Sequence, residues 1–248
     1  MKRILLYLLL GLCVVAAWEF FGSNNQTFRL LLSSPSLVTT YISENYVDLF
    51  IATRTTLTEA VAGLLIATLF SFAVMVICFF RPSVMEFILP LMVTSQVIPL
   101  IVLAPFFIIL LGIGLASKIA MAAVISFFPI FVNFAHGYKS INENIHELMH
   151  IYDASTSFRI KHVYFPLSAG HIIAGLKVSA TLSVIGAIVA EFTGAENGLG
   201  KNLFLSAIRL EPELMMASLL LSALLGVGLF AGIWSIERTI PGGINSNE

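Results

Sequence analysis

Residues 61–80 read VAGLLIATLFSFAVMVICFF, an apolar run that contains no charged side chain. A helix needs about 20 predominantly apolar residues to cross the hydrocarbon core of a bilayer, so this run alone predicts a membrane-spanning helix. The rest of the chain agrees, because 58% of its 248 residues are hydrophobic and only 11% are charged. The net charge of −1 argues against a nucleic-acid partner. The sequence therefore predicts an all-α integral membrane protein whose surface faces the lipid bilayer.

Apolar runs recur along the chain and predict about six membrane spans. They cover residues 4–21, 49–80, 84–111, 117–138, 169–192 and 214–236. Pro90, Pro99 and Pro105 interrupt the third span, which predicts a broken or kinked helix there, because each proline removes a backbone donor. No long polar linker or repeat separates the spans, so residues 1–248 are expected to form a single transmembrane domain.

The first run follows Lys2 and Arg3, as the apolar part of a signal peptide would. It is long enough to span a bilayer and further spans follow it, so we interpret it as an uncleaved first helix. The densest basic stretch, residues 139–161, is expected in the cytoplasm by the positive-inside rule. Both termini are then cytoplasmic, and residues 23–48 form an external loop that could include a short helix on the membrane.

Residues 146–150 read HELMH, which matches the zinc-protease pattern of two histidines one helical turn apart around a glutamate. His146 and His150 would bind Zn²⁺ and Glu147 would activate water, but this chemistry needs a third protein ligand. Candidate third ligands are Asp153, His171 and Glu191, none of them in a recognisable context. A membrane zinc metalloprotease is therefore the alternative function, beside the simpler interpretation of a solvated helix face.

Residues 194–202 have some features of a phosphate-binding loop. Ala195 stands at the first required glycine and Asn202 at the Ser/Thr position, and no parallel strand precedes them. No ATP and no other cofactor is therefore expected on this chain.

The stretch from Glu147 to Pro166 resembles the cytoplasmic signature of ABC importer permeases. That signature is Glu-Ala-Ala, then a glycine and, further on, Leu-Pro. Here Glu147-Leu148-Met149 stands for the first element, Ala154-Ser155 matches the pair after the glycine, and Phe165-Pro166 matches the closing pair. Both alanines are replaced, and Asp153 occupies the glycine position.

Other motifs resemble the nitrate, sulfonate and taurine branch of the same permeases, in the same order along about residues 18–236. They are Thr56-Leu57 with Glu59 and Gly63, Pro99 to Pro105, Gly112-Ile113-Gly114, Phe127-Phe128-Pro129, Ala174 to Ser179, Ala190-Glu191-Phe192, and Gly198-Leu199-Gly200. Several motifs in order are more specific than any one of them.

The resemblance implies the type I importer permease fold, in the cell inner membrane. It also implies a second permease subunit, a copy of this chain, with the translocation pathway at the dimer interface. Two cytoplasmic ATP-binding subunits would dock on the loops around 139–166, and an external binding protein would deliver the solute. The branch carries nitrate, sulfonates, taurine and pyrimidine vitamin precursors, and the permease itself is not an enzyme.

In such a loop, residues 147–151 and 155–163 are expected to form two short helices joined near Asp153. The aspartate could adopt a positive φ, which Asp tolerates better than most residues, or it could cap the second helix. The sequence leaves both possibilities open.

Polar residues inside the spans are the last candidates. Glu59, Lys177 and Glu191 are ionisable, and such residues often mark a pathway. Glu191 is expected to be solvated or paired with the external loop, and Lys177 to extend to the cytoplasmic surface. The candidate pathway residues are Thr94, Ser95, Gln96, Pro99, Ser179 and Ser183. Serine at such spacing is also typical of helix packing. A proton-coupled secondary transporter, the other rival, would need more and deeper carboxylates.

Overall fold

The computed structural model describes residues 2–24 and 32–239, and the regular structure in these ranges is helical throughout. The helices are α1 Lys2–Asn24, α3 Pro35–Glu44, α4 Tyr46–Phe80, α5 Pro82–Ser95, α6 Leu100–Leu111, α7 Leu115–Lys139, α8 Glu143–Ile151, α9 Thr156–Phe158, the π-helix η1 Arg159–Tyr164, α10 Phe165–Glu191, α11 Leu199–Arg209 and α12 Pro212–Thr239. The all-α prediction is confirmed.

Four segments within the described ranges are long and apolar enough to cross a membrane by length and composition. They are Tyr46–Phe80, Leu115–Lys139, Thr156–Glu191 and Pro212–Arg238. Three shorter apolar helices accompany them, at Leu9–Ser23, Ser83–Ser95 and Ile101–Leu111. Of the external loop predicted over residues 23–48, residues 25–31 lie outside the described ranges, and α3 forms within the remainder.

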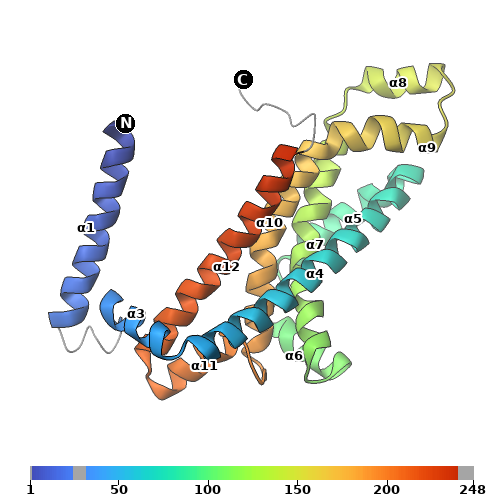
Figure 1. Cartoon of the computed structure of the whole chain (residues 1–248). Coiled ribbons are helices and arrows are strands. Elements are labelled where there is room, and N and C mark those ends of the chain that lie inside the picture. Colours follow the sequence, from blue (N-terminus) through green and yellow to red (C-terminus); the bar gives the residue numbers. More distant parts are fainter. Residues whose placement is uncertain (1, 25–31, 240–248) are drawn as a thin grey trace.

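The bundle is built around α7 and α10, which make the most extensive helix–helix contact, and α4 crosses them obliquely (Figure 1). Ala122 of α7 is fully buried where the three helices meet. A Cβ on Gly63 of α4 would lie 2.5 Å from the Cβ of Ala122, and one on Gly186 of α10 would lie 2.7 Å from its Cα. Small residues therefore allow the close backbone approach that membrane helices use for packing.

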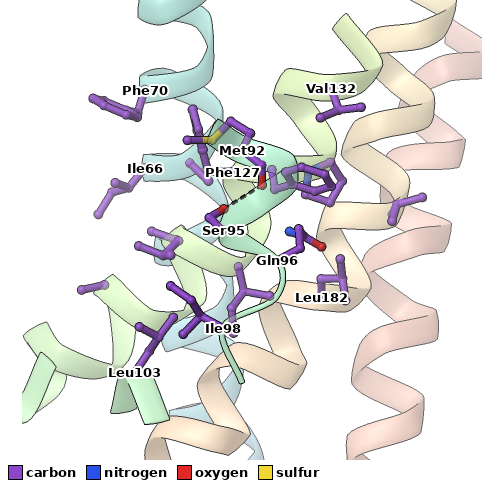
Figure 2. Close-up of a pocket in the computed structure, with 18 of the residues that line it drawn as sticks. Ile66, Phe70, Met92, Ser95, Gln96, Ile98, Leu103, Phe127, Val132 and Leu182 are labelled. Atoms are coloured by element: carbon purple, nitrogen blue, oxygen red, sulfur yellow. Dashed lines mark hydrogen bonds between the residues drawn. The ribbon is translucent and has the colours of Figure 1, made fainter. Parts of the chain in front are cut away.

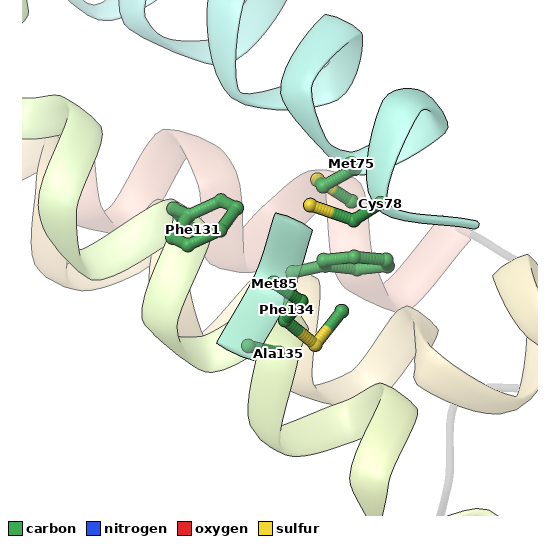
Figure 3. Packing of buried hydrophobic residues seen from close by; sticks show 6 residues of the cluster. All are labelled: Met75, Cys78, Met85, Phe131, Phe134 and Ala135. Atoms are coloured by element: carbon green, nitrogen blue, oxygen red, sulfur yellow. The ribbon is translucent and has the colours of Figure 1, made fainter. Parts of the chain in front are cut away.

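An apolar core holds the α4–α5 corner against α7 near the end of the bundle that carries α8 (Figure 3). It is formed by Met75 and Cys78 of α4, Met85 of α5, and Phe131, Phe134 and Ala135 of α7. Each is 3% exposed or less, so dispersion contacts between tightly packed side chains hold this corner. Cys78 serves there as a small apolar side chain.

The third predicted span is broken at one point. Helix α5 ends at Ser95 and α6 begins at Leu100, with Pro99 at the N-cap of α6. Pro90 and Pro105 lie inside α5 and α6. The chain is thus interrupted only at residues 96–99 of this region.

The prediction of a separate second helix over 155–163, followed by a span from 169, is wrong. Helices α9, η1 and α10 follow one another without a break, as one 36-residue segment, Thr156–Glu191. A proline usually ends a helix before it. Here the π-helical turn of η1, in which the Phe165 N–H donates to the Ile160 carbonyl, directly precedes Pro166 and accommodates the missing donor.

Candidate functional site

The loop between α7 and α10 contains α8, a helix with a well-defined start. The Asn142 side chain accepts a hydrogen bond from the Asn144 N–H (2.9 Å), which caps the helix N-terminus. The helix begins at Glu143, one turn before the predicted position 147. Its mixture of apolar and polar residues produces two different faces, one toward the bundle and one exposed.

The turn after α8 resolves the choice that the sequence left open for Asp153. Asp153 adopts φ 45°, in the left-handed region, and its N–H donates to the His150 carbonyl (3.0 Å). The cap of α9 is instead Ser155, whose hydroxyl accepts from the Phe158 N–H (3.3 Å). Asp153 therefore reverses the chain, so that α8 lies beside α9 (Figure 1).

The inner face of α8 is joined to the bundle by a cluster of rings, which we call the aromatic contact (Phe79, Tyr138, His146 and Tyr164). His146 Nδ1 lies 3.1 Å from the Tyr164 hydroxyl. The Tyr138 ring packs edge-on against His146 and Tyr164, and Phe79 of α4 stacks on Tyr164 at 5.4 Å between centroids. A displacement of α8 would therefore act directly on α4, α7 and η1.

The outer face of α8 and the turn that follows it expose apolar side chains, which we call the loop patch (Leu148, Ile151, Tyr152 and Phe158). Ile151 is 78% exposed and Tyr152 is 74% exposed. A groove of about 490 Å³ lies alongside, lined by Met149, Tyr152, Ala154, Ser155 and Phe158. Exposed apolar patches that are rimmed by polar residues mark interaction sites.

The structure brings most of the predicted loop residues together, with two exceptions. Leu148, Met149, Ala154 and Ser155 lie at or beside the loop patch, and Glu147 is exposed on α8. Phe165 and Pro166 belong instead to the first turn of α10, where the Phe165 ring packs edge-on against Phe72 at 6.0 Å.

The HELMH motif lacks the surroundings of a zinc site. His146 is engaged with Tyr164, while His150 is exposed. Within residues 2–24 and 32–239, no group of three or more His, Cys, Asp or Glu side chains could hold a metal ion. The third ligand that zinc catalysis requires is therefore not supplied by this part of the chain.

A cavity of about 920 Å³ opens between α4, the α5–α6 break, α7 and α10 (Figure 2). The polar residues that line it are Ser95 at the end of α5, Gln96 in the break and Asn133 of α7. Ser95 donates to the Met92 carbonyl (2.7 Å). Asn133 was not among the candidate pathway residues that the sequence suggested. Its amide donates to the Pro129 carbonyl (2.8 Å), so its position four residues after Pro129 is the signal that could have indicated it.

The other candidate pathway residues do not line this cavity. Thr94 and Pro99 are exposed, and the Thr94 hydroxyl donates to the Pro90 carbonyl. Ser179 and Ser183 are fully buried. Ser179 exchanges hydrogen bonds with Ser126 of α7, each hydroxyl donating to the other residue's carbonyl (2.7 and 3.3 Å). Ser179 thus packs α10 against α7, whereas the Ser183 hydroxyl donates to the Ala180 carbonyl within α10. Neither serine lines this cavity, and their place in the pathway stays a prediction.

The three ionisable residues that the sequence singled out, Glu59, Lys177 and Glu191, each lie close to polar or charged partners. Lys177 Nζ lies 2.5 Å from a Glu237 carboxylate oxygen of α12, so it does not extend alone to the surface. Glu59 is buried 3.5 Å from Lys118 Nζ. Glu191 is 1% exposed, so its expected solvation is wrong. Its carboxylate accepts hydrogen bonds from the Thr56 hydroxyl of α4 and from the Gly200 N–H in the first turn of α11.

A model of the family described as binding-protein-dependent transport system inner membrane component matches residues 60–238. The chain belongs to this family. It is a multi-pass permease of the inner membrane and a transport component rather than an enzyme, as predicted. Its system includes an ATPase and a binding protein, because the family operates in binding-protein-dependent ABC importers.

Relatives agree with this family assignment. The permease is similar to the probable ABC transporter permease protein of Haemophilus influenzae, with 27% identity over 96% of this chain and 98% of the relative. The formylaminopyrimidine transport permease protein ThiX of Halalkalibacterium halodurans is 32% identical over 72% of this chain and 71% of its own length. A protein named for aliphatic sulfonates transport, SsuC of Bacillus subtilis, is 21% identical over 97% of this chain and 88% of its own.

Proposed function

We propose that the permease has six spans, with both termini and the α8 loop in the cytoplasm, in the type I importer arrangement. The start of α1, the end of α12 and α8 all lie at one end of the molecule, which supports this topology (Figure 1). The permease pairs with a second copy of itself, and the translocation pathway runs at the interface of the two copies.

Coupling to ATP hydrolysis occurs through the α8 loop. Two cytoplasmic ATP-binding subunits dock on the loop patches of the permease pair, and an external binding protein delivers the solute. The single observation that carries this proposal is that α8 has the exposed loop patch on one side and the aromatic contact with Tyr164 on the other. ATP-driven movement of the partner would push α8, and the aromatic contact would pass that displacement to the segment Thr156–Glu191.

The docking proposal is tested by placing a charge in the loop patch. Ile151→Asp should weaken co-purification of the ATPase subunit with the permease by about tenfold or more, because a charge would be buried in an apolar interface. Leu210→Asp is the matched control, since Leu210 is 79% exposed at the other end of the bundle. Equal ATPase retention by the two variants would contradict docking on the loop patch.

The transported solute is proposed to be uncharged and to have heteroaromatic or amide character. Among the described residues, those that line the cavity carry no formal charge. They include Phe70, Phe127 and Phe128, together with the polar groups of Ser95, Gln96 and Asn133. An anion in an apolar cavity requires positive partners, whereas a planar neutral ring is suited by aromatic faces and amides. Similarity to ThiX points to the same vitamin-precursor class within the nitrate, sulfonate, taurine and vitamin-precursor range.

Solute-stimulated ATP hydrolysis distinguishes these solutes. In proteoliposomes that contain the complete importer, formylaminopyrimidine should stimulate ATP hydrolysis, while taurine, nitrate and alkylsulfonates should not. Gln96→Leu should weaken this stimulation by about tenfold, because the amide is replaced by an apolar group of similar size. Stimulation by taurine, nitrate or a sulfonate alone would overturn the proposed solute class.

A further inference from the structure

The C-terminal end of α10 holds a buried carboxylate that the coupling scheme does not use. Glu191, its last residue, accepts a hydrogen bond from the Thr56 hydroxyl of α4 (2.7 Å) on one oxygen. Its other oxygen accepts from the Gly200 N–H (2.5 Å), in the first turn of α11. The Thr56 hydroxyl in turn accepts from the Leu199 N–H (2.9 Å).

These contacts cap α11 from two other helices. The first N–H groups of a helix have no partner within it, and a carboxylate there also interacts favourably with the helix dipole. The residue at the N-cap position, Gly198, has no side chain that could do this. Glu191 and Thr56 therefore replace the usual local cap, which ties the start of α11 to α10 and α4.

The glycines of the loop are required by this close approach. A Cβ on Gly198 would lie 2.2 Å from the Glu191 carboxylate, and one on Gly200 would lie 2.4 Å from the Ile188 carbonyl. Gly198 also has φ 138°, which side-chain-bearing residues rarely adopt. The loop sequence thus fits around the Glu191 carboxylate.

A second buried carboxylate adds α7 to the same junction. Glu59 lies one turn after Thr56 on α4, is fully buried, and faces Lys118 of α7 at 3.5 Å. Neither Glu59 oxygen has a hydrogen-bond donor among the described residues. Burying such groups is costly, and removing one partner leaves an uncompensated charge, so the junction has little tolerance for rearrangement.

We propose that Glu191 is a positioning residue that couples α11 to the α8 loop through the continuous helical segment Thr156–Glu191. This segment has the turn at Asp153 before its first residue and Glu191 as its last. Movement of the α8 loop is thereby delivered to α11 at the opposite end of the bundle (Figure 1). The inference rests on the proposed coupling of the α8 loop to the ATPase.

The test uses the complete importer in lipid nanodiscs, with native cysteines replaced and one cysteine placed at Ser206, which is 2% exposed on α11. A non-hydrolysable ATP analogue should change the rate of maleimide labelling at residue 206. Glu191→Gln should abolish this nucleotide response and reduce transport by about tenfold, because a charge-assisted hydrogen bond is lost. ATPase retention should be unchanged. Glu196→Gln, an exposed carboxylate in the same loop, is the control.

Two substitutions at Thr56 provide an independent arm should Glu191→Gln fail to fold. Thr56→Val removes the bridging hydroxyl and should lose the nucleotide response, whereas Thr56→Ser retains the hydroxyl and should preserve it. The role of Glu191 would be overturned by either of two results. One is a labelling rate at residue 206 that does not change with nucleotide, and the other is a normal nucleotide response in both Glu191→Gln and Thr56→Val. If Ile151→Asp also keeps its ATPase, the coupling proposal itself fails, and the two failures are therefore distinguishable.

Discussion

At the scale of single residues, Asp153 illustrates how one backbone angle shapes the loop. A left-handed conformation costs an L-residue about 1–2 kcal/mol, and Asp reduces this cost through local hydrogen bonding. Asp153→Gly should therefore raise the free energy of unfolding by up to about 1 kcal/mol, and Asp153→Val should lower it by about 1 kcal/mol or more. Chemical unfolding of the purified permease in detergent measures both changes.

The neighbouring residue provides the control for this prediction. Tyr152 has φ −81°, an ordinary value, so Tyr152→Gly adds backbone freedom without relieving strain. It should destabilise the permease, in contrast to Asp153→Gly. If both glycine variants change the free energy of unfolding in the same direction, the prediction that Asp153 has a strained backbone conformation is contradicted.

Single residues were also where the sequence was least informative. The sequence identified Asp153, because this residue replaces the glycine of the signature. The choice between a positive φ at Asp153 and a helix cap could be made only from the structure, in which Ser155 caps the three-residue helix α9. In the sequence, Ser179 cannot be distinguished from a serine that lines a pathway. Only the position of Ser126 on another helix reveals that it packs α7 against α10.

At the scale of elements, hydropathy located the long helices but not their junctions. A proline such as Pro166 usually ends a helix, whereas here the π-helical turn of η1 continues the helix past it. Helix α11 was not expected, because it is short and polar enough to escape a search for spans. Leu199 and Leu203, four residues apart after Gly198, form the amphipathic pattern that could have predicted it.

The elements that the sequence missed are those that join the two ends of the bundle. Because α9 continues into α10, one helical segment runs from just after the turn at Asp153 to the Glu191 junction. The unexpected helix α11 is the element that this segment caps. The cap of α11 also depends on the contacts of Thr56 with Glu191 and Leu199, residues distant in sequence, which periodicity along a single helix does not report.

At the scale of the whole molecule, the length of the segment Thr156–Glu191 bears on which loops lie on opposite sides of the membrane. Its 36 residues extend about 54 Å at 1.5 Å per residue, well beyond the roughly 30 Å hydrocarbon core. This length suits the proposed topology, in which the α8 loop before the segment and the loop after Glu191 lie on opposite faces of the membrane. The basic stretch 139–161 predicts that the α8 side is the cytoplasmic one.

Single cysteines test this arrangement in a Cys13→Ser, Cys78→Ala background. Asn144→Cys on α8 should react with a membrane-impermeant maleimide only in inside-out vesicles, and Glu196→Cys only in right-side-out vesicles, since both side chains are exposed. Detergent-solubilised permease should label at both positions, which controls for shielding by a partner. Labelling of both cysteines from one side would contradict a membrane-spanning Thr156–Glu191, and with it the coupling of α8 to α11 across the bilayer.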